Sequence, residues 1–208
     1  EIMTDENLPK VTRHYRSALL DSSRWRYVQP RTDDIVVSTA YKGGTTWMQA
    51  ICGALVFQSI DPPATLDELS PWIDAAFRPI DKLRIKLEAM QQRRYLKTHL
   101  PLAALPYNAG TSYIVVGRDG RDVWMSMSNH WNNMKPEGID KITTNPHRKG
   151  PPFPMPPSDM KSAFNDWLGK GSFPWEKDGY PFWSHHYPAA TWWKYRNLSN
   201  ILHVHFTD

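Results

Sequence analysis

Short apolar runs alternate with segments of helical spacing along most of this chain. Four runs have the length and composition of buried parallel strands. They span Ile35 to Thr39, Tyr95 to His99, Tyr113 to Gly117, and Ile201 to Phe206. Strands that alternate with helices predict an α/β fold, with a central parallel sheet flanked by helices and joined by right-handed crossovers. Ligands of such sheets bind beyond the carboxyl ends of the strands, so the residues that follow each run are candidates for a site.

The helices are predicted from apolar residues three or four positions apart. Two such sets follow the first and third strands: Trp47, Met48, Ile51 and Leu55, then Val123, Met127 and Trp131. Another helix is expected to begin near Ser158 or Asp159, and a further one to span Trp183 to Tyr195. No internal repeat interrupts this order, and residues 1–208 are expected to form a single domain.

One stretch, from Asn132 to Asp159, shows neither pattern. It holds six prolines between Pro146 and Pro157, and proline lacks the backbone donor that helices and central strands need. Irregular stretches of this length inside a compact domain are typically lids, binding loops or disordered segments. We therefore expect residues 132–159 to form a proline-rich lid or an insertion loop.

Size and composition fit one soluble globular domain. The chain has 208 residues, of which 40% are hydrophobic and 22% charged, enough for a substantial core. No apolar run reaches the roughly 18 residues of a membrane span, and no secretory leader is visible. The single cysteine, Cys52, rules out an internal disulfide and fits a reducing compartment. The expected location is cytoplasmic, with Cys52 as a buried thiol rather than a nucleophile.

The net charge of the chain indicates what kind of ligand it binds. The formal net charge of +4 favours an anionic ligand, but lysines and arginines are scattered, which does not indicate a nucleic acid or a membrane partner. Ten tryptophans are enough to line an apolar pocket as well as to fill a core. No pattern in the sequence sets the oligomeric state.

The segment YKGGTTW, residues 41–47, directly follows the first strand and opens a helix. Glycines let the backbone approach a ligand closely, and the free N–H groups of a helix start bind anions. The residues expected to hold the phosphate end of a nucleotide are Lys42, Gly43, Gly44, Thr45, Thr46 and Trp47. The lysine precedes both glycines, whereas the loop of ATP and GTP enzymes places it after the second.

A second strand, turn and helix start carry different chemistry. Arg118 ends the third strand and Ser126 follows eight residues later. If the helix begins near Gly120 or Arg121, a planar guanidinium and a hydroxyl can reach the same phosphate. Two such motifs in this order predict that the loop at residues 41–47 and the segment from Arg118 to Ser126 bind opposite ends of one nucleotide.

The segment KTHLP, residues 97–101, is the third motif. On a strand, residues two apart share a face, so Lys97 and His99 are expected to point the same way. Pro101 ends the strand and leaves His99 at its exposed carboxyl end. Histidine, with a reference pKa of roughly 6.5, can remove a proton near neutral pH.

Together, the three motifs resemble those of the sulfotransferases that use 3′-phosphoadenosine 5′-phosphosulfate (PAPS), the cytosolic type in particular. Their phosphosulfate loop has the form YPKSGTTW, which this chain matches in register at Lys42, Gly44, Thr45, Thr46 and Trp47. Their 3′-phosphate motif has a K/R-D-V core, matched by Arg121, Asp122 and Val123. The likeness extends from about Trp25 to Asp208 and implies a fold of the P-loop nucleotide-kinase type.

Two positions of the loop depart from the family. Tyr41 stands where the family has proline, and Gly43 stands where it has serine. The second change removes a hydroxyl that the family uses near the sulfuryl group. Its task is left to Lys42 or to the backbone.

The resemblance assigns a role to each candidate. It implies that the loop binds the phosphosulfate, that Trp47 stacks on adenine, and that Arg118 and Ser126 bind the 3′-phosphate. His99 would remove the acceptor's proton, while Lys42, assisted by Lys97, stabilises charge on the departing 5′-phosphate. The implied reaction moves a sulfuryl group from PAPS to a hydroxyl or amine, releases adenosine 3′,5′-bisphosphate (PAP) and needs no metal.

Structural explanations exist for the same residues taken singly. Thr45 and Thr46 can cap a helix, Trp47 can belong to the core, and Arg118 can pair with Asp119 or Asp122. The pairs His185-His186 and His203-His205 suggest a metal, but no cysteine or carboxylate stands nearby at ligand spacing.

Two other functions remain open on the sequence alone. One is a nucleotide-binding protein without catalytic activity, and the other is a kinase-like phosphotransferase on a related architecture. The resemblance also implies a C-terminal segment RKGxxGxWK that completes the nucleotide site and does not occur in these 208 residues. If the protein ends here, weak donor binding and little turnover are expected.

The acceptor is expected to be a small apolar or aromatic alcohol. This expectation depends on aromatic residues that suit such a molecule, around Phe77, Trp131, Phe153 and Trp175.

Overall fold

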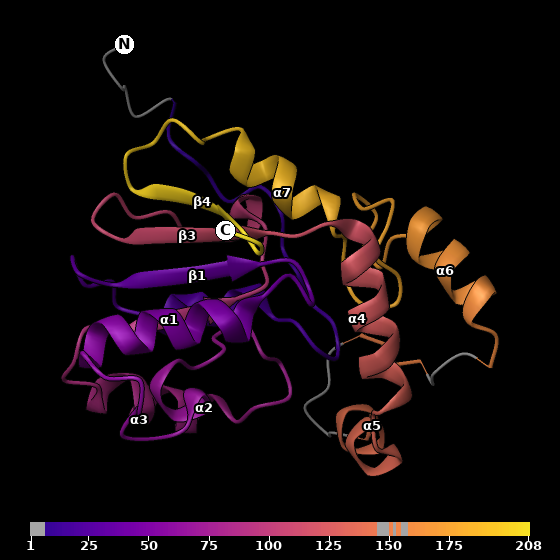
Figure 1. Cartoon of the computed structure of the whole chain (residues 1–208), viewed down its shortest axis with the longest axis horizontal. Helices are drawn as coiled ribbons and strands as arrows, with labels where there is room; N and C mark the ends of the chain where they lie inside the picture. Colours follow the sequence, from indigo (N-terminus) through magenta and orange to yellow (C-terminus); the bar gives the residue numbers. More distant parts are fainter. Residues whose placement is uncertain (1–6, 145–149, 152, 155–157) are drawn as a thin grey trace.

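A computed structural model describes residues 7–144, 150–151, 153–154 and 158–208 of the chain. Its centre is a parallel sheet in the order β2-β1-β3-β4, shown in Figure 1. The strands are β1 (Ile35–Thr39), β2 (Tyr95–Thr98), β3 (Ser112–Gly117) and β4 (Ile201–His205). The predicted α/β class and all four predicted strands are confirmed, with ends that differ by at most one residue.

Alternation along the strands explains how the sheet divides two hydrophobic clusters. In β1, Ile35 and Val37 pack with Met48 and Cys52 of the following helix. Val36, between them, faces the larger cluster on the other side. Successive strand residues point to opposite faces, so an apolar run with no polar interruption is buried on both. Cys52 is a buried thiol, as expected.

The helices that surround the sheet are α1 (Thr45–Phe57), α2 (Leu66–Leu69), α3 (Ile80–Ala89), α4 (Gly120–Asn132), α5 (Pro136–Thr143), α6 (Met160–Gly169) and α7 (His186–Trp193), with 3₁₀ turns η2 (Ser22–Tyr27) and η3 (Leu102–Ala104). Helices α4, α5 and α6 lie beyond the carboxyl ends of the strands (Figure 1). Within the described residues, no helix is both long and apolar enough to cross a bilayer.

The helix predicted after β1 is confirmed as α1, with Ile51 and Leu55 on its exposed side. Two other helix predictions need correction. Helix α7 is shorter than predicted. The stretch 132–159 was expected to be irregular, yet α5 lies within it, because proline at a first helical position removes only a donor that has no partner there. Most of the prolines on which that prediction rested, including Pro146, lie outside the described residues.

One further segment extends the sheet beside β2. The backbone N–H of Lys97 donates to Pro71 O at 3.1 Å, and the N–H of Ile73 donates to Lys97 O at 3.1 Å. Trp72 thereby forms a parallel bridge with Lys97. This short pairing places residues 71–74 against the strand that carries the KTHLP motif.

Candidate active site

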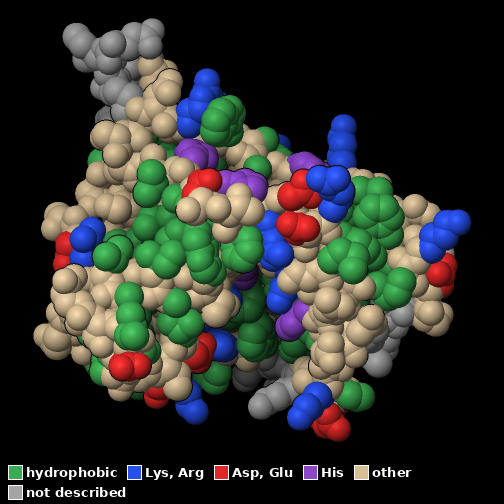
Figure 2. Space-filling model, viewed as in Figure 1, with side chains coloured by type: hydrophobic (Ala, Val, Ile, Leu, Met, Phe, Trp, Pro, Cys, Tyr) green, Lys and Arg blue, Asp and Glu red, His purple; other side chains and the backbone are tan. Residues whose placement is uncertain are grey.

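A cavity of about 560 Å³ opens at the carboxyl ends of the strands. Residues that follow each of the four strands reach its wall: Lys42 after β1, His99 after β2, Arg118 after β3 and Phe206 after β4. Figure 2 shows this face hollowed at its middle, with basic and histidine side chains on the walls. The position is the one expected for a ligand of a parallel α/β sheet.

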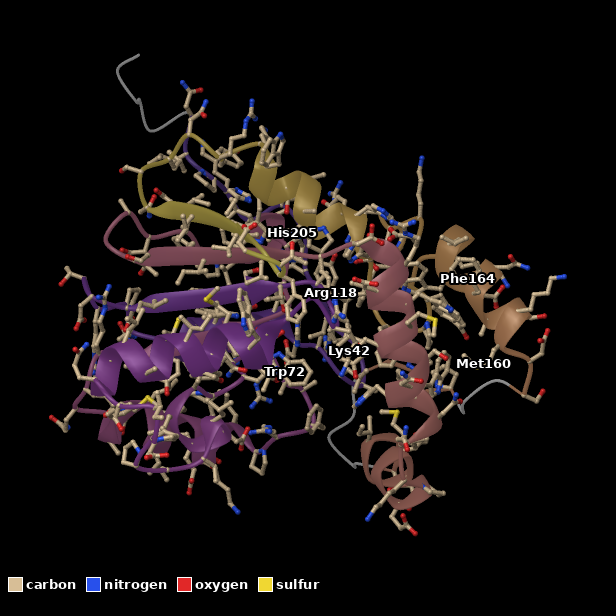
Figure 3. The ribbon with its side chains drawn as sticks, viewed as in Figure 1. Lys42, Trp72, Arg118, Met160, Phe164 and His205 are labelled. Carbon is tan, nitrogen blue, oxygen red and sulfur yellow. The ribbon has the colours of Figure 1, made fainter. Side chains whose placement is uncertain are left out.

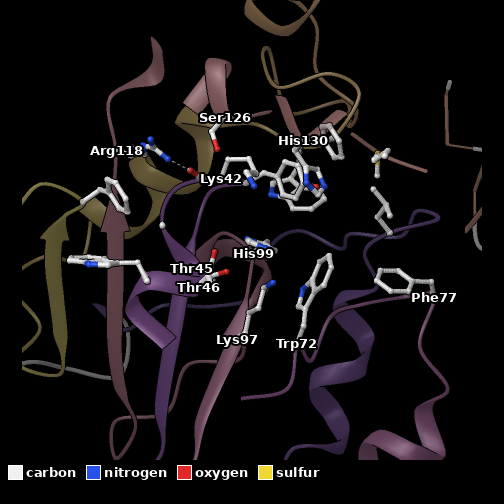
Figure 4. Close-up of a pocket in the computed structure, with 18 of the residues that line it drawn as sticks. Lys42, Thr45, Thr46, Trp72, Phe77, Lys97, His99, Arg118, Ser126 and His130 are labelled. Atoms are coloured by element: carbon white, nitrogen blue, oxygen red, sulfur yellow. Dashed lines mark hydrogen bonds between the residues drawn. The ribbon is translucent and has the colours of Figure 1, made fainter. Parts of the chain in front are cut away.

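The labelled residues in Figure 4 run along this cavity from Arg118 at one end to Phe77 at the other. Lys42, His99 and Lys97 lie between these ends. In the wider view, Lys42, Trp72 and Arg118 lie where the sheet meets α4 (Figure 3). The cavity therefore has a guanidinium group at one end, two lysines and a histidine in its middle, and an aromatic ring at the other end.

The turn between β1 and α1 depends on glycine. Gly44 has φ 107°, a left-handed conformation that glycine adopts without penalty. A Cβ on Gly44 would lie 2.5 Å from Cδ2 of Phe206, so a side chain is excluded by contact as well. The N–H of Gly43 donates to Ala40 O at 3.0 Å, which closes the turn and leaves Gly43 outside the cavity wall.

The start of α1 is open to an anion. Among the described residues, no side chain caps the helix at Gly44, and the N–H of Met48 is the first to donate to a helical carbonyl, Gly44 O at 3.0 Å. The N–H groups ahead of it have no intrahelical acceptor. The Thr45 hydroxyl pairs with that of Thr39 instead of capping. The capping explanation for Thr45 is therefore wrong, and the helix start suits a phosphate or sulfate group.

Arg118 lies against the lysine of this turn. Its Nη1 donates to Lys42 O at 3.1 Å, and its guanidinium carbon lies 4.4 Å from the centre of the Phe206 ring. Its buried Nε has no partner among the described residues. Among the described residues it forms no ion pair with Asp119 or Asp122, and Asp119 pairs with Arg121 instead. A half-satisfied guanidinium at a cavity wall is suited to a bound anion.

His99 is buried, not exposed as the sequence suggested. Only 3% of its surface is accessible, and three aromatic rings surround it: Trp72 at 5.0 Å, Trp183 at 5.2 Å and Tyr41 at 5.9 Å between ring centres. Its Nδ1 lies 2.9 Å from Thr39 O. A carbonyl only accepts, so Nδ1 carries the hydrogen and Nε2 presents its lone pair.

Burial and two lysines set the protonation of this site. Desolvation, followed by the charges of Lys97 and Lys42, holds the pKa of His99 well below 6.5. Desolvation also lowers the pKa of Lys97, to about 8, and that of Lys42, which Arg118 lowers further. His99 is therefore neutral at pH 7 and can accept a proton there, while Lys97 remains mostly a cation.

The structure brings nearly all predicted site residues together. Lining the cavity are Lys42, Gly44, Thr45, Thr46, Trp47, Lys97, His99, Arg118 and Ser126. Lys97 and His99 share one wall, as strand alternation predicted. Trp47 reaches the cavity and also packs 5.3 Å from the Phe206 ring, so the core explanation holds only in part.

The predicted aromatic lining was mostly wrong. Of its four residues only Phe77 lies on the cavity, because Trp131 and Phe153 are buried in the core and Trp175 packs on Tyr15. The rings found there instead include Tyr41, Trp72, His130, Phe182 and Trp183. Only Tyr41 has a sequence signal, since it adjoins the loop motif; packing of remote segments brings the others.

A model of the sulfotransferase domain family matches residues 32–208. A glycolipid sulfotransferase of Mycobacterium tuberculosis is 33% identical over 211 residues, which cover 93% of this chain and 64% of the relative. Sulfotransferase 1C2 of Rattus norvegicus is 26% identical over 88% of this chain and 57% of the relative. The chain thus spans less than two thirds of the length of these relatives.

Solved structures share the fold. A mouse sulfotransferase, SULT7A1, complexed with PAP matches with a TM-score of 0.60 and 22% identity, over 88% of this chain and 55% of that one. A retinol dehydratase in complex with retinol and PAP matches with a TM-score of 0.57 and 18% identity, over 84% and 55%. At these identities the likeness concerns the fold alone.

Proposed function

This chain belongs to the sulfotransferase domain family, and from this premise we propose that the protein transfers a sulfuryl group from PAPS to a hydroxyl or amine of a small-molecule acceptor. PAPS supplies a sulfur that is already activated by its bond to phosphate. The chain supplies an anion site, a base and cations around one cavity. PAP is the second product.

The observation that carries this proposal is the contact between the two halves of the nucleotide site. Arg118 donates to the carbonyl of Lys42 at 3.1 Å, although the two residues are 76 positions apart in the chain. The uncapped start of α1 and the Arg118 Nε that lacks a described partner fit two anionic groups. A nucleotide with phosphate groups at both ends matches this pair of sites.

His99 is assigned the proton transfer. The acceptor oxygen or nitrogen forms a bond to sulfur, and the bond from sulfur to the bridging phosphate oxygen breaks. The acceptor's proton passes to Nε2 of His99, because Nδ1 is held at Thr39 O. The low pKa of His99 keeps the ring neutral before the step.

Lys42 and the start of α1 are assigned to the leaving group. Negative charge develops on the bridging oxygen as its bond to sulfur lengthens. Positioned cations and N–H donors stabilise such charge strongly when water is excluded. Lys97, on the same wall as His99, adds a second cation on the acceptor side.

The acceptor is assigned a substantial apolar part. The cavity wall contains Leu19, Phe77, Met134, Ile142, Phe182 and Trp183, and apolar walls with few polar groups are typical of small-molecule sites. A relative bears the name glycolipid sulfotransferase, and a structural neighbour binds retinol. An alcohol that carries an apolar chain or ring system is consistent with both.

The test is transfer of radiolabelled sulfate from PAPS to a panel of glycolipids, apolar alcohols and phenols, with ATP and Mg²⁺ as the rival donor. His99→Ala is expected to lower kcat by roughly 10²- to 10⁴-fold and to leave PAP affinity, measured by calorimetry, nearly unchanged. His14→Ala is the matched control, because His14 is exposed and far from the motif residues in sequence. PAP binding without transfer to any acceptor, or full activity of His99→Ala, contradicts the proposal.

A further inference from the structure

A buried carboxylate lies directly behind the wall that carries His99 and Lys97. Asp74 has 0% of its surface accessible and does not line the cavity itself. Its Oδ1 accepts from Nε1 of Trp25 at 3.2 Å. Its Oδ2 accepts from Nε1 of Trp72 at 2.7 Å and from the backbone N–H of His99 at 3.2 Å.

The chemistry of these partners identifies Asp74 as an acceptor. Indole and backbone N–H groups only donate, so an ionised carboxylate satisfies all three. Burial raises the pKa of Asp74, and the hydrogen bonds to its carboxylate offset only part of that rise. A buried carboxyl group that several donors hold in place commonly has a functional reason.

The short pairing beside β2 explains how Asp74 reaches this place. Hydrogen bonds between Lys97 and its neighbours Pro71 and Ile73 fix the register of the two segments. With that register, Asp74 lies opposite His99. A second bond, from the N–H of Asp21 to Asp74 O at 2.9 Å, holds the segment from its other side.

Trp72 lies between the Asp74 carboxylate and the side chains of His99 and Lys97. Its ring centre lies 5.0 Å from that of His99, nearly perpendicular to it, and 4.7 Å from Nζ of Lys97. Both rings and the ammonium group border the cavity. The bond from Nε1 of Trp72 to Asp74 fixes the indole plane against which the other two groups pack.

We propose that Asp74 is a positioning residue of the transfer reaction: by holding the His99 backbone and the Trp72 indole, it sets the geometry of His99 and Lys97 on one wall of the cavity. The inference rests on the proposed function and adds a residue to it. Asp74 touches neither the cavity nor a substrate, so it acts only through these neighbours.

The positioning role of Asp74 can also be tested through the pKa of Lys97. Asp74 raises the pKa of Lys97 and partly offsets burial, which lowers it to about 8. Arg78 and Lys42 lower this pKa as well, and Asp67 raises it. Replacing Asp74 by asparagine removes one of the two stabilising charges, so the pKa of Lys97 is expected to fall further.

The experiment compares Asp74→Asn and Trp72→Phe with Trp25→Phe as the matched control. Trp25→Phe removes the indole bond to Oδ1 but leaves both bonds at Oδ2 intact. We expect Asp74→Asn to lower kcat up to about a hundredfold, as small misplacements of reacting groups do, with PAP affinity unchanged. Trp72→Phe keeps a ring but lacks the N–H donor, and it should lower kcat in the same direction. Trp25→Phe should lower the melting temperature with little change in kcat.

The pKa of Lys97 is followed by NMR with isotope-labelled lysine, and its signal is assigned from Lys97→Arg. A lower pKa in Asp74→Asn, together with the loss of kcat, supports the proposal. Unchanged kcat in Trp72→Phe, or equal losses in Trp72→Phe and Trp25→Phe, overturns it even if Asp74→Asn does not fold. If the wild type binds PAP but transfers nothing, the proposed function fails, whereas an unchanged Lys97 pKa in Asp74→Asn contradicts the role of Asp74.

Discussion

Arg118 and Arg121 lie three positions apart, yet their surroundings assign them different tasks. Arg118 is partly buried, contacts the Lys42 carbonyl and packs on the Phe206 ring. The Arg121 side chain is 89% exposed and forms a 2.9 Å ion pair with Asp119. An exposed pair of this kind contributes little, whereas a positioned guanidinium can bind a phosphate strongly.

Arg118→Ala is therefore expected to weaken PAP binding by about 1.5–3 kcal/mol, which is roughly tenfold to a hundredfold. Adenosine 5′-monophosphate lacks the 3′-phosphate, so its affinity should change much less. Calorimetry with both nucleotides measures the difference, and Arg121→Ala serves as the control. Equal losses for the two nucleotides would show that Arg118 does not recognise the 3′ group.

The rate of transfer should depend on pH in two steps. His99 must be neutral to accept a proton, and its pKa lies well below 6.5, so activity should persist at pH 6.5 and fall only in more acidic solution. Lys97 acts as a cation, and its pKa is about 8, so activity should fall again above that pH. Measuring kcat from pH 5 to 10 with a stable acceptor tests both limbs. An acid limb centred at or above pH 6.5 would contradict the burial of the base.

The site residues that lie within short, contiguous sequence motifs were predicted from the sequence. Lys42, His99 and Arg118 were predicted because each follows a strand in a local pattern. Asp74 and Trp183 were missed, since each reaches the site through packing between segments that carry no motif. The burial of His99 was missed for the same reason: its covering rings come from other parts of the chain.

At the scale of elements, the apolar runs were sufficient to predict all four strands. A strand buried on both faces needs no alternation, and only its length and composition reveal it. Two elements were not predicted because the local sequence pattern that would indicate them is weak. Helix α5 begins with Pro136 inside a stretch that lacks a helical apolar pattern, and the pairing of residues 71–74 with β2 depends on two long-range backbone bonds.

The loop before α1 should not tolerate a side chain at its second glycine. Gly44→Ala forces a left-handed conformation that costs an L-residue roughly 1–2 kcal/mol, and the new Cβ meets Phe206 at 2.5 Å. We expect a lower melting temperature and weaker PAP binding, because the turn that presents the α1 start must shift.

Gly138→Ala provides the matched control for this loop. A Cβ on Gly138 meets nothing within 4 Å, and the residue lies inside α5, where alanine favours the helix by up to about 1 kcal/mol. Its melting temperature should stay level or rise, with PAP affinity unchanged. Wild-type PAP affinity in Gly44→Ala would show that the loop does not have to keep this shape to bind the nucleotide.

At the scale of the whole molecule, the two ends of the sheet affect the stability of the fold differently. At the carboxyl ends, Arg118 Nε has no partner among the described residues, Lys42 and Gly44 have positive φ angles, and the charges of Lys42 and Arg118 lie close together. Each of these features opposes folding when no ligand is bound. The amino ends contain a paired charge instead. Arg94 binds both carboxylate oxygens of Asp34, at 2.7 Å and 2.5 Å, with side chains only 3% and 2% accessible.

Separation of these ends predicts that stability can be changed without changing the site. Arg94→Met keeps most of the side-chain volume but leaves Asp34 buried without its cation, which typically costs about 3–5 kcal/mol. Arg94 also donates to Gln29 O at 2.8 Å, so the substitution removes a hydrogen bond to the loop before β1 as well. Denaturant unfolding should show the loss, while PAP affinity measured well below the melting temperature should match the wild type. Arg93→Met, at an exposed residue that donates to Asp33 O, should change neither quantity by much. A parallel loss of PAP affinity in Arg94→Met would mean that the charge at one end of the sheet is coupled to the nucleotide site at the other.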